Sequence, residues 1–151
     1  MTMQGTAAHR LLQLGVALFL LGLLTGLAIP ALANPRMALA SHIEAVMNGT
    51  FLVVLGLVWP RMRLPPRLLA TAFWLAVYGA FANWLATLLA AAWRAGNPMM
   101  PLAAQGHSGT LTQEILLKAL LISLALAMIG SCLLVLLGLR RTAAQRTENQ
   151  A

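Results

Sequence analysis

Acidic residues are almost missing from this sequence. Its 151 residues include three of Asp and Glu combined, and all three are glutamate. Charged residues amount to 9% of the chain, whereas hydrophobic residues make up 60%. A soluble domain carries about 25% charged and about 45–50% apolar residues. The shortage of charge therefore excludes an ordinary soluble domain and indicates an integral membrane protein.

Cysteine is scarce as well, and so are clustered basic residues. The single cysteine, Cys132, excludes an intrachain disulfide. The net charge of +7 comes from ten Lys and Arg residues that are scattered between apolar runs. Such scattering is typical of the ends of membrane helices and not of a nucleic-acid surface, so we expect no nucleic-acid partner. No phosphate-binding loop, zinc signature or tandem repeat is present in the sequence.

Long apolar runs are what the sequence has in abundance. Because the hydrocarbon core is about 30 Å thick, a membrane-spanning helix needs about 20 residues. Four runs satisfy this length, at residues 11–33, 41–59, 68–93 and 112–139. The first run resembles a signal peptide, but its length favours a retained span. We therefore expect an all-α integral membrane protein, a four-helix bundle over residues 1–139 followed by a polar, disordered tail over residues 140–151.

The distribution of basic residues predicts the orientation of these spans. With four spans, both termini and the connection between the second and third spans lie on one side. That side carries seven of the ten basic residues, and the cytoplasmic side of a membrane protein is normally the richer one. We therefore expect both termini in the cytoplasm of a bacterial-type cell, with the protein in its inner membrane.

Three polar residues occur within seven positions at the start of the second run. The pattern Ser41-x-x-Glu44 predicts a capping box, which would explain Glu44 without any chemistry. The cap does not explain His42, which is either a hydrogen-bonded surface residue or a neutral ligand for iron. Asn48 falls one turn below Glu44 on the same helix face and must pair across a helix interface or with a ligand. Gly49 would let a neighbouring helix or a flat ligand approach closely.

The third run adds a second intramembrane amide. Its sequence YGAFANW places Tyr78 and Asn83 in the middle of the span, where we expect both to be buried. Asn83 either joins two helices or lines one cavity together with Asn48.

The start of the fourth run carries further candidate residues in the stretch GHSGTLTQEILLK. Thr110-x-x-Gln113 predicts a capping box. The spacing of Glu114 and Lys118 predicts an i, i+4 ion pair. His107 falls in the preceding loop, near the entrance of the second span. A nonhaem metal site made by the two histidines and two glutamates of this end is chemically possible, but no tight ligand spacing supports it.

Three blocks of this sequence resemble a known enzyme family. SHIEAVMNGTFLVVLGLVWPRMRL, YGAFANWLATLLAAAW and NPMMPLAAQGHSGTLTQEILLK cover most of residues 41–122 and are similar to the hydroxylaminobenzene mutases. The resemblance implies a small membrane enzyme that isomerises an arylhydroxylamine to an ortho-aminophenol. It therefore implies a small aromatic substrate.

A more distant resemblance connects the chain to styrene oxide isomerase, a four-helix membrane enzyme. Both have a histidine followed six residues later by Asn-Gly, and an aromatic-Ala-Asn sequence in the third span. That relative is a homotrimer with haem b. The resemblance implies that His42 binds the iron, that Gly49 leaves room for the macrocycle, and that Asn48 orients the substrate, with Asn83 as a further catalytic candidate. The relative has a tyrosine where this chain has Thr87.

Three alternatives stay open at this stage. The first is a cofactor-free mutase that uses Glu44 or His42 as an acid–base group. The second is a b-type cytochrome without enzymatic activity, which would require His107 as a second axial ligand. The third is a small transporter, which normally needs a carboxylate deep in a span. Glu44 and Glu114 are expected near helix starts, and this speaks against transport.

Overall fold

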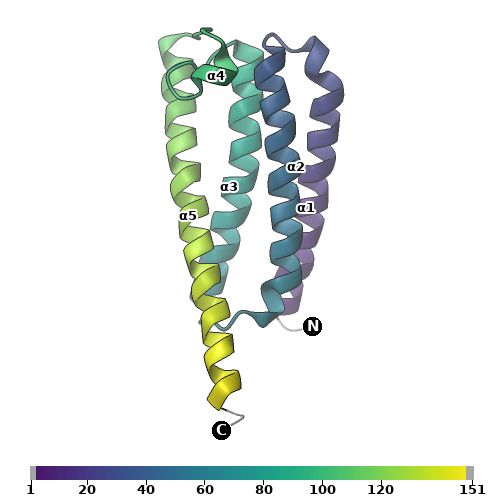
Figure 1. The fold of residues 1–151 in the computed structure, drawn as a ribbon, viewed down its shortest axis with the longest axis vertical. Helices are drawn as coiled ribbons and strands as arrows, with labels where there is room; N and C mark the ends of the chain where they lie inside the picture. Colours follow the sequence, from purple (N-terminus) through teal and green to yellow (C-terminus); the bar gives the residue numbers. More distant parts are fainter. Residues whose placement is uncertain (1–2, 149–151) are drawn as a thin grey trace.

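The computed structural model describes residues 3–148, with the side chains of residues 4–140. Over these residues the chain forms helices and no strands, which confirms the predicted all-α class. The elements are α1 (Met3–Ala28), the 3-10 turn η1 (Ile29–Ala31), α2 (Pro35–Val58), the 3-10 turn η2 (Trp59–Arg61), α3 (Pro66–Trp93), the short α4 (Pro101–Ala104) and α5 (Leu111–Glu148). Figure 1 shows the four long helices side by side, with both termini at one end and α4 at the other.

The four long helices pack chiefly as a row in the order α1, α2, α3, α5, with a smaller direct contact between α1 and α3. Helix α2 packs against α1 on one side and α3 on the other, and α5 packs against α3 (Figure 1). α1 and α5 therefore stand at opposite ends of the row. One edge of α2 consequently faces α1 and the other faces α3, so polar residues on the two edges of α2 have different neighbours.

Glycines bring α1 and α2 unusually close together. A Cβ atom added to Gly49 of α2 would lie 2.7 Å from the backbone nitrogen of Phe19 and 2.8 Å from the carbonyl oxygen of Gly15, both in α1. Carbon atoms in ordinary contact are about 3.5–4.0 Å apart, so no side chain fits there. The α1–α2 contact is therefore made backbone to backbone, as small residues permit in membrane helices.

The second span begins earlier than we predicted. Helix α2 starts at Pro35, and the side chain of Asn34 accepts a 3.1 Å hydrogen bond from the amide of Met37. Asn at the cap followed by Pro at the first helical position is a favoured helix start. The prediction of a start at Ser41 is therefore wrong by six residues. The pair Asn34-Pro35 indicates this helix start, but the prediction followed the apolar run and did not use it.

The last helix also differs from the prediction. α5 continues to Glu148, where we expected a disordered tail from residue 140. The segment RRTAAQRTE contains Ala, Arg, Gln and Glu without Gly or Pro, so nothing in it interrupts a helix. Residues 149–151 of the expected tail lie outside the described residues.

Four helices are long and apolar enough to cross a membrane within residues 3–148, and their apolar spans are Gln4–Ala31, Pro35–Arg61, Pro66–Trp93 and Leu111–Arg140. Large apolar side chains such as Leu27, Leu57 and Leu126 point outward from these helices and are more than 60% exposed. An apolar outer surface of this extent is stable in lipid and not in water. The protein is therefore a multi-pass membrane protein.

Candidate functional site

Glu44 lies deep within its span and not at a helix start. The apolar span Pro35–Arg61 has its midpoint at residue 48, so Glu44 is about 6 Å from the middle along the helix axis. The hydrocarbon core extends about 15 Å on each side of its centre. The predicted capping box is wrong, because Ser41 is inside the helix and donates a 3.1 Å hydrogen bond to the carbonyl oxygen of Trp84 in α3.

The carboxylate of Glu44 binds two asparagine side chains. Asn83 of α3 donates from Nδ2 to Oε2 at 2.6 Å, and Asn48 of α2 donates to the same oxygen at 3.3 Å. The prediction that Asn48 shares a face with Glu44 is confirmed. We call these three residues the carboxylate–amide cluster. A membrane carboxylate normally pairs with a cation, and this one has two neutral amides instead.

The second carboxylate oxygen of Glu44 is accessible. Both hydrogen bonds go to Oε2, and Oε1 has no partner in the part of the chain that the structure describes. No buried side-chain nitrogen or oxygen among those residues lacks a hydrogen bond, so the unpaired Oε1 must reach the surface. Glu44 and Asn83 are each half-buried. The cluster therefore holds one carboxylate oxygen fixed and presents the other.

His42 occupies the opposite edge of α2. Its Nδ1 atom lies 2.8 Å from the carbonyl oxygen of Gly22 in α1, and its ring fills the space beside Gly26. Because a carbonyl can only accept, Nδ1 carries a proton, and in the neutral ring the lone pair is on Nε2. Nε2 has no partner among the described residues and is accessible by the same reasoning as above. His42 therefore has the tautomer and free nitrogen that iron requires.

A second polar network, which the sequence analysis missed, joins the first three helices at this depth. The indole nitrogen of Trp84 in α3 donates to Thr25 Oγ1 in α1 at 3.0 Å, and Thr25 donates to the carbonyl oxygen of Leu21 at 2.8 Å. Together with the bond from Ser41 to Trp84, it holds α1, α2 and α3 in register beside the cluster. Thr25 and Ser41 are buried. The signal that the sequence offered was a polar residue inside each of two apolar runs.

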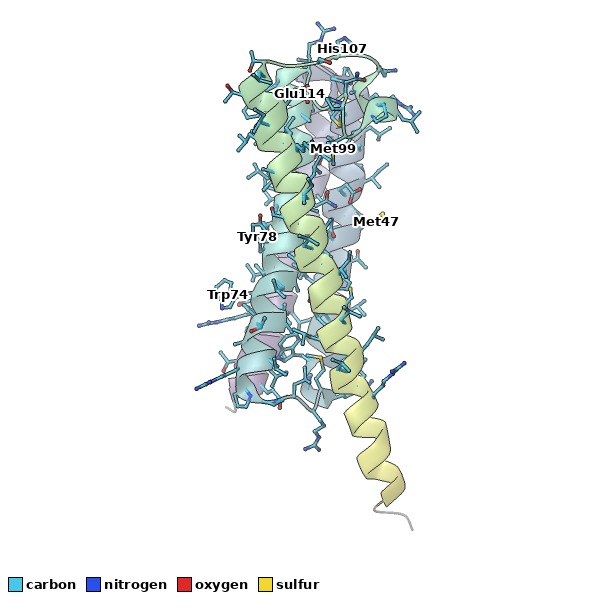
Figure 2. The ribbon with its side chains drawn as sticks, turned by 90° about the vertical axis from the view of Figure 1, so that its left-hand side faces the viewer. Met47, Trp74, Tyr78, Met99, His107 and Glu114 are labelled. Atoms are coloured by element: carbon cyan, nitrogen blue, oxygen red, sulfur yellow. The ribbon has the colours of Figure 1, made fainter. Side chains whose placement is uncertain are left out.

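Two other predicted pocket residues do not join the cluster. Tyr78 was expected to be buried, but it is 44% exposed and its hydroxyl lies 2.6 Å from Ser123 Oγ of α5. Figure 2 shows Tyr78 and Met47 on opposite sides of the molecule. Thr87 is buried, and its hydroxyl donates to the carbonyl oxygens of Asn83 and Trp84 in its own helix. Helix packing against α1 already accounts for Gly49.

Glu114 holds the loop between α3 and α5. Its carboxylate accepts hydrogen bonds from the amides of Gly96, at 2.9 and 3.1 Å, and of Gly109, at 2.8 Å. The predicted ion pair with Lys118 is wrong, since these loop amides and not the lysine occupy the carboxylate. Glu114 therefore organises the end of the molecule that carries α4 (Figure 2).

The same end contains the predicted capping box and the third histidine of the chain. The amide of Thr110 donates to Gln113 Oε1 at 2.8 Å and the amide of Gln113 approaches Thr110 Oγ1 at 3.4 Å, so the box is confirmed. His107 bonds Arg94 through Nε2 and the carbonyl oxygen of Ala104 through Nδ1. Both of its ring nitrogens are therefore engaged within the loop.

No group of three or more His, Cys, Asp or Glu side chains that could hold a metal ion exists among the described residues. The nonhaem site considered from the sequence, which combined His42, Glu44, His107 and Glu114, is therefore not formed. His42 remains as a single nitrogen donor.

Comparison with known proteins identifies close relatives. The chain is 58% identical over 142 residues to hydroxylaminobenzene mutase HabB of Ectopseudomonas oleovorans, covering 94% of this chain and 87% of the relative. It is 44% identical over 127 residues to hydroxylaminobenzene mutase HabA of the same organism, covering 84% of this chain and 94% of the relative. The sequence pattern of the styrene oxide isomerase family matches residues 7–140. No solved structure matches the chain.

Four apolar helices, a polar cluster within the span and relatives that are mutases define a multi-pass membrane isomerase. The chain belongs to the styrene oxide isomerase family. Within that family its similarity is to the hydroxylaminobenzene mutases, as the three sequence blocks predicted.

Proposed function

We propose that the protein rearranges an arylhydroxylamine, such as hydroxylaminobenzene, to an ortho-aminophenol inside the membrane. The names of the two relatives supply the substrate class. The observation that carries the proposal is the carboxylate–amide cluster of Glu44, Asn48 and Asn83, whose unpaired oxygen is accessible at hydrocarbon depth. An arylhydroxylamine brings an N–H and an O–H donor to that oxygen.

The asparagine side chains orient the substrate in this proposal. Each uses one N–H to hold Glu44, which leaves the amide oxygen of Asn48 and that of Asn83 as additional acceptors. The spans that carry the cluster are apolar, and apolar helix walls suit an aromatic ring. Such walls also keep water away from a reactive intermediate.

A haem b held by His42 belongs to the proposal, and the donor chemistry of His42 fits it. The carbonyl of Gly22 fixes the proton on Nδ1 and orients the ring, so Nε2 is the atom that would bind iron. Gly26, beside the ring, leaves room for that orientation. When bound, ferric haem supplies a Lewis acid that weakens the N–O bond of the substrate.

We also propose that the enzyme is a homo-oligomer, with a homotrimer as the expected form. Within one chain His42 faces α1 and the carboxylate–amide cluster faces α3, so the two lie on opposite edges of α2. Contact between subunits can bring the histidine edge of one chain to the cluster of another. This arrangement would account for both polar edges of the same helix.

The orientation is proposed from the basic residues. Both termini and η2 lie at one end of the molecule, and the exposed Arg61, Arg63, Arg67 and Arg140 lie at that end (Figure 1). We place this end in the cytoplasm and the protein in the inner membrane of a bacterial-type cell. An alkaline phosphatase fused to the C-terminus should be inactive in that orientation, and an active fusion would reverse it.

The test of function uses the purified protein in detergent with hydroxylaminobenzene, and chromatography of the products. We expect 2-aminophenol as the product, and the absence of turnover would refute the proposal. The haem is tested separately by the absorption spectrum. His42→Ala should lose the Soret band and the activity, whereas His9→Ala, which changes an exposed histidine of α1, should keep both. An active, colourless wild-type protein would retain the mutase and refute the haem.

A further inference from the structure

The proposed rearrangement requires a proton to move between two atoms of the substrate. The N–O bond breaks with its electron pair leaving on oxygen, and the hydroxyl forms a C–O bond at the ortho carbon. That carbon then carries both hydrogen and oxygen, and nitrogen is doubly bonded to the ring. To restore the aromatic ring, the carbon loses its proton and its C–H electron pair returns to the ring, while nitrogen gains a proton. Atoms and electrons balance without any oxidant or reductant.

Water is a poor carrier for this proton at the depth of the cluster. Glu44 and Asn48 lie within about 6 Å of the middle of an apolar span. A protein group must therefore take the proton from carbon and return it to nitrogen. The carrier needs a titratable atom that is accessible and beside the groups that orient the substrate.

Few titratable groups in the described part of the spans meet this requirement. Tyr78 is bonded to α5 on the far side of α3, and Cys132 lies on the outer surface of α5. His42 faces α1, on the opposite edge of α2 from the two asparagines, and its free nitrogen is the atom proposed to bind iron. Glu44 has an accessible oxygen beside both asparagines.

We propose that Glu44 is the proton carrier of the rearrangement, an inference that rests on the proposed function. Oε1 accepts the proton from the ortho carbon and delivers a proton to the nitrogen of the same substrate molecule. Oε2 stays bound to Asn83 at 2.6 Å and to Asn48 at 3.3 Å, so the carboxyl group cannot rotate away. The two oxygens of one carboxyl group thus have separate tasks, positioning and proton transfer.

The experiment compares the full-length wild-type protein with Glu44→Gln, Glu44→Asp and Thr50→Val. Thr50→Val is the matched control, because it removes a polar group of the same helix whose hydroxyl bonds only its own backbone, at 2.8 Å from the oxygen of Val46. Each variant receives hydroxylaminobenzene and its ortho-deuterated form, and kcat, KM and the isotope effect are measured. Folding and pigment content are compared by gel filtration and absorption spectrum.

For Glu44→Gln we expect kcat to fall at least ~100-fold with little change in KM, since general acid–base groups contribute roughly 10²–10⁴-fold. Proton loss from carbon then limits the rate, so an ortho-deuterium isotope effect should appear that the wild type and Thr50→Val do not show. Glu44→Asp should recover part of the rate and keep part of the isotope effect, because it restores a carboxyl group at a longer distance.

Two results would overturn the inference while the proposed function stands. One is a Glu44→Gln protein that turns over within about threefold of wild type. The other applies where Glu44→Gln does not fold: a folded Glu44→Asp enzyme that turns over more slowly but shows no ortho-deuterium isotope effect, because the displaced carboxyl group would then not have slowed the proton step. Absence of 2-aminophenol from the wild type itself would refute the proposed function, and this inference with it.

Discussion

Replacing Gly49 with alanine tests whether the α1–α2 contact is as close as the structure has it. The new Cβ would lie 2.7 Å from Phe19 N, 2.8 Å from Gly15 O and 3.0 Å from Phe19 Cα. All three atoms belong to the α1 backbone, so no side chain can rotate to make room. The helices must separate by several tenths of an ångström. Overpacking of this kind costs about 1–3 kcal/mol.

The same substitution has an opposite, intrinsic effect that must be subtracted. Alanine is favoured over glycine inside a helix by about 0.5–1 kcal/mol. The net expectation for Gly49→Ala is therefore a destabilisation of about 1 kcal/mol at the midpoints of the two ranges, and of up to about 2.5 kcal/mol. Gly130→Ala of α5 is the matched control, because its Cβ would meet only the flexible end of Leu75, at 3.4 Å. We expect that variant to be as stable as the wild type or slightly more stable.

Unfolding by increasing SDS in mixed micelles, followed by circular dichroism, measures both variants on one scale. The Gly49→Ala midpoint should lie clearly below that of the wild type, and the Gly130→Ala midpoint at or above it. Equal midpoints for the two variants, or a more stable Gly49→Ala protein, would show that α1 and α2 are not packed backbone to backbone. The structural explanation of Gly49 would then be wrong.

Three further substitutions test individual contacts. Asn83→Leu removes the 2.6 Å hydrogen bond to Glu44. Because a hydrogen bond to a charged group contributes about 1.5–3 kcal/mol, we expect the free energy of unfolding in SDS to fall by that amount and turnover to be reduced. Unchanged stability would contradict the hydrogen bond. Glu114→Gln weakens the hold on the Gly109 amide, which should exchange its hydrogen at least about tenfold faster, and wild-type protection would show that Glu114 does not organise the loop. Asn34→Ala removes the α2 cap, which should cost about 0.5–2 kcal/mol, and also the bonds from Asn34 Nδ2 to the carbonyl oxygens of Ala103 and Ala104; a cost near zero would mean that neither the cap nor those bonds stabilise the protein.

Hydropathy was sufficient to predict the four membrane spans, because whether a segment is stable in lipid depends on its local composition. Each of the four predicted runs overlaps one long helix, and the box at Thr110 and Gln113 formed where the sequence placed it. The start of α2 was missed because Asn34 and Pro35 interrupt an apolar stretch, and the prediction followed hydropathy when cap chemistry determined the helix start.

The partners of the polar residues could not be predicted in the same way, because they come from other helices. The α2 periodicity was enough to place Asn48 below Glu44, but not to show that Asn83, 39 positions away, makes the shorter bond to the same oxygen. Lys118 had the spacing for an ion pair with Glu114, yet the loop amides took the carboxylate.

The sequence by itself determined that this protein is an all-α membrane protein, because charge is excluded from lipid wherever it occurs along a chain. It also determined the relatives, through three long blocks of residues. Only the tertiary structure decided that His42 and the carboxylate–amide cluster face opposite edges of α2. The physical reason is that residues two positions apart on a helix point in nearly opposite directions, and the packing of α1 and α3 gives each direction its own neighbour.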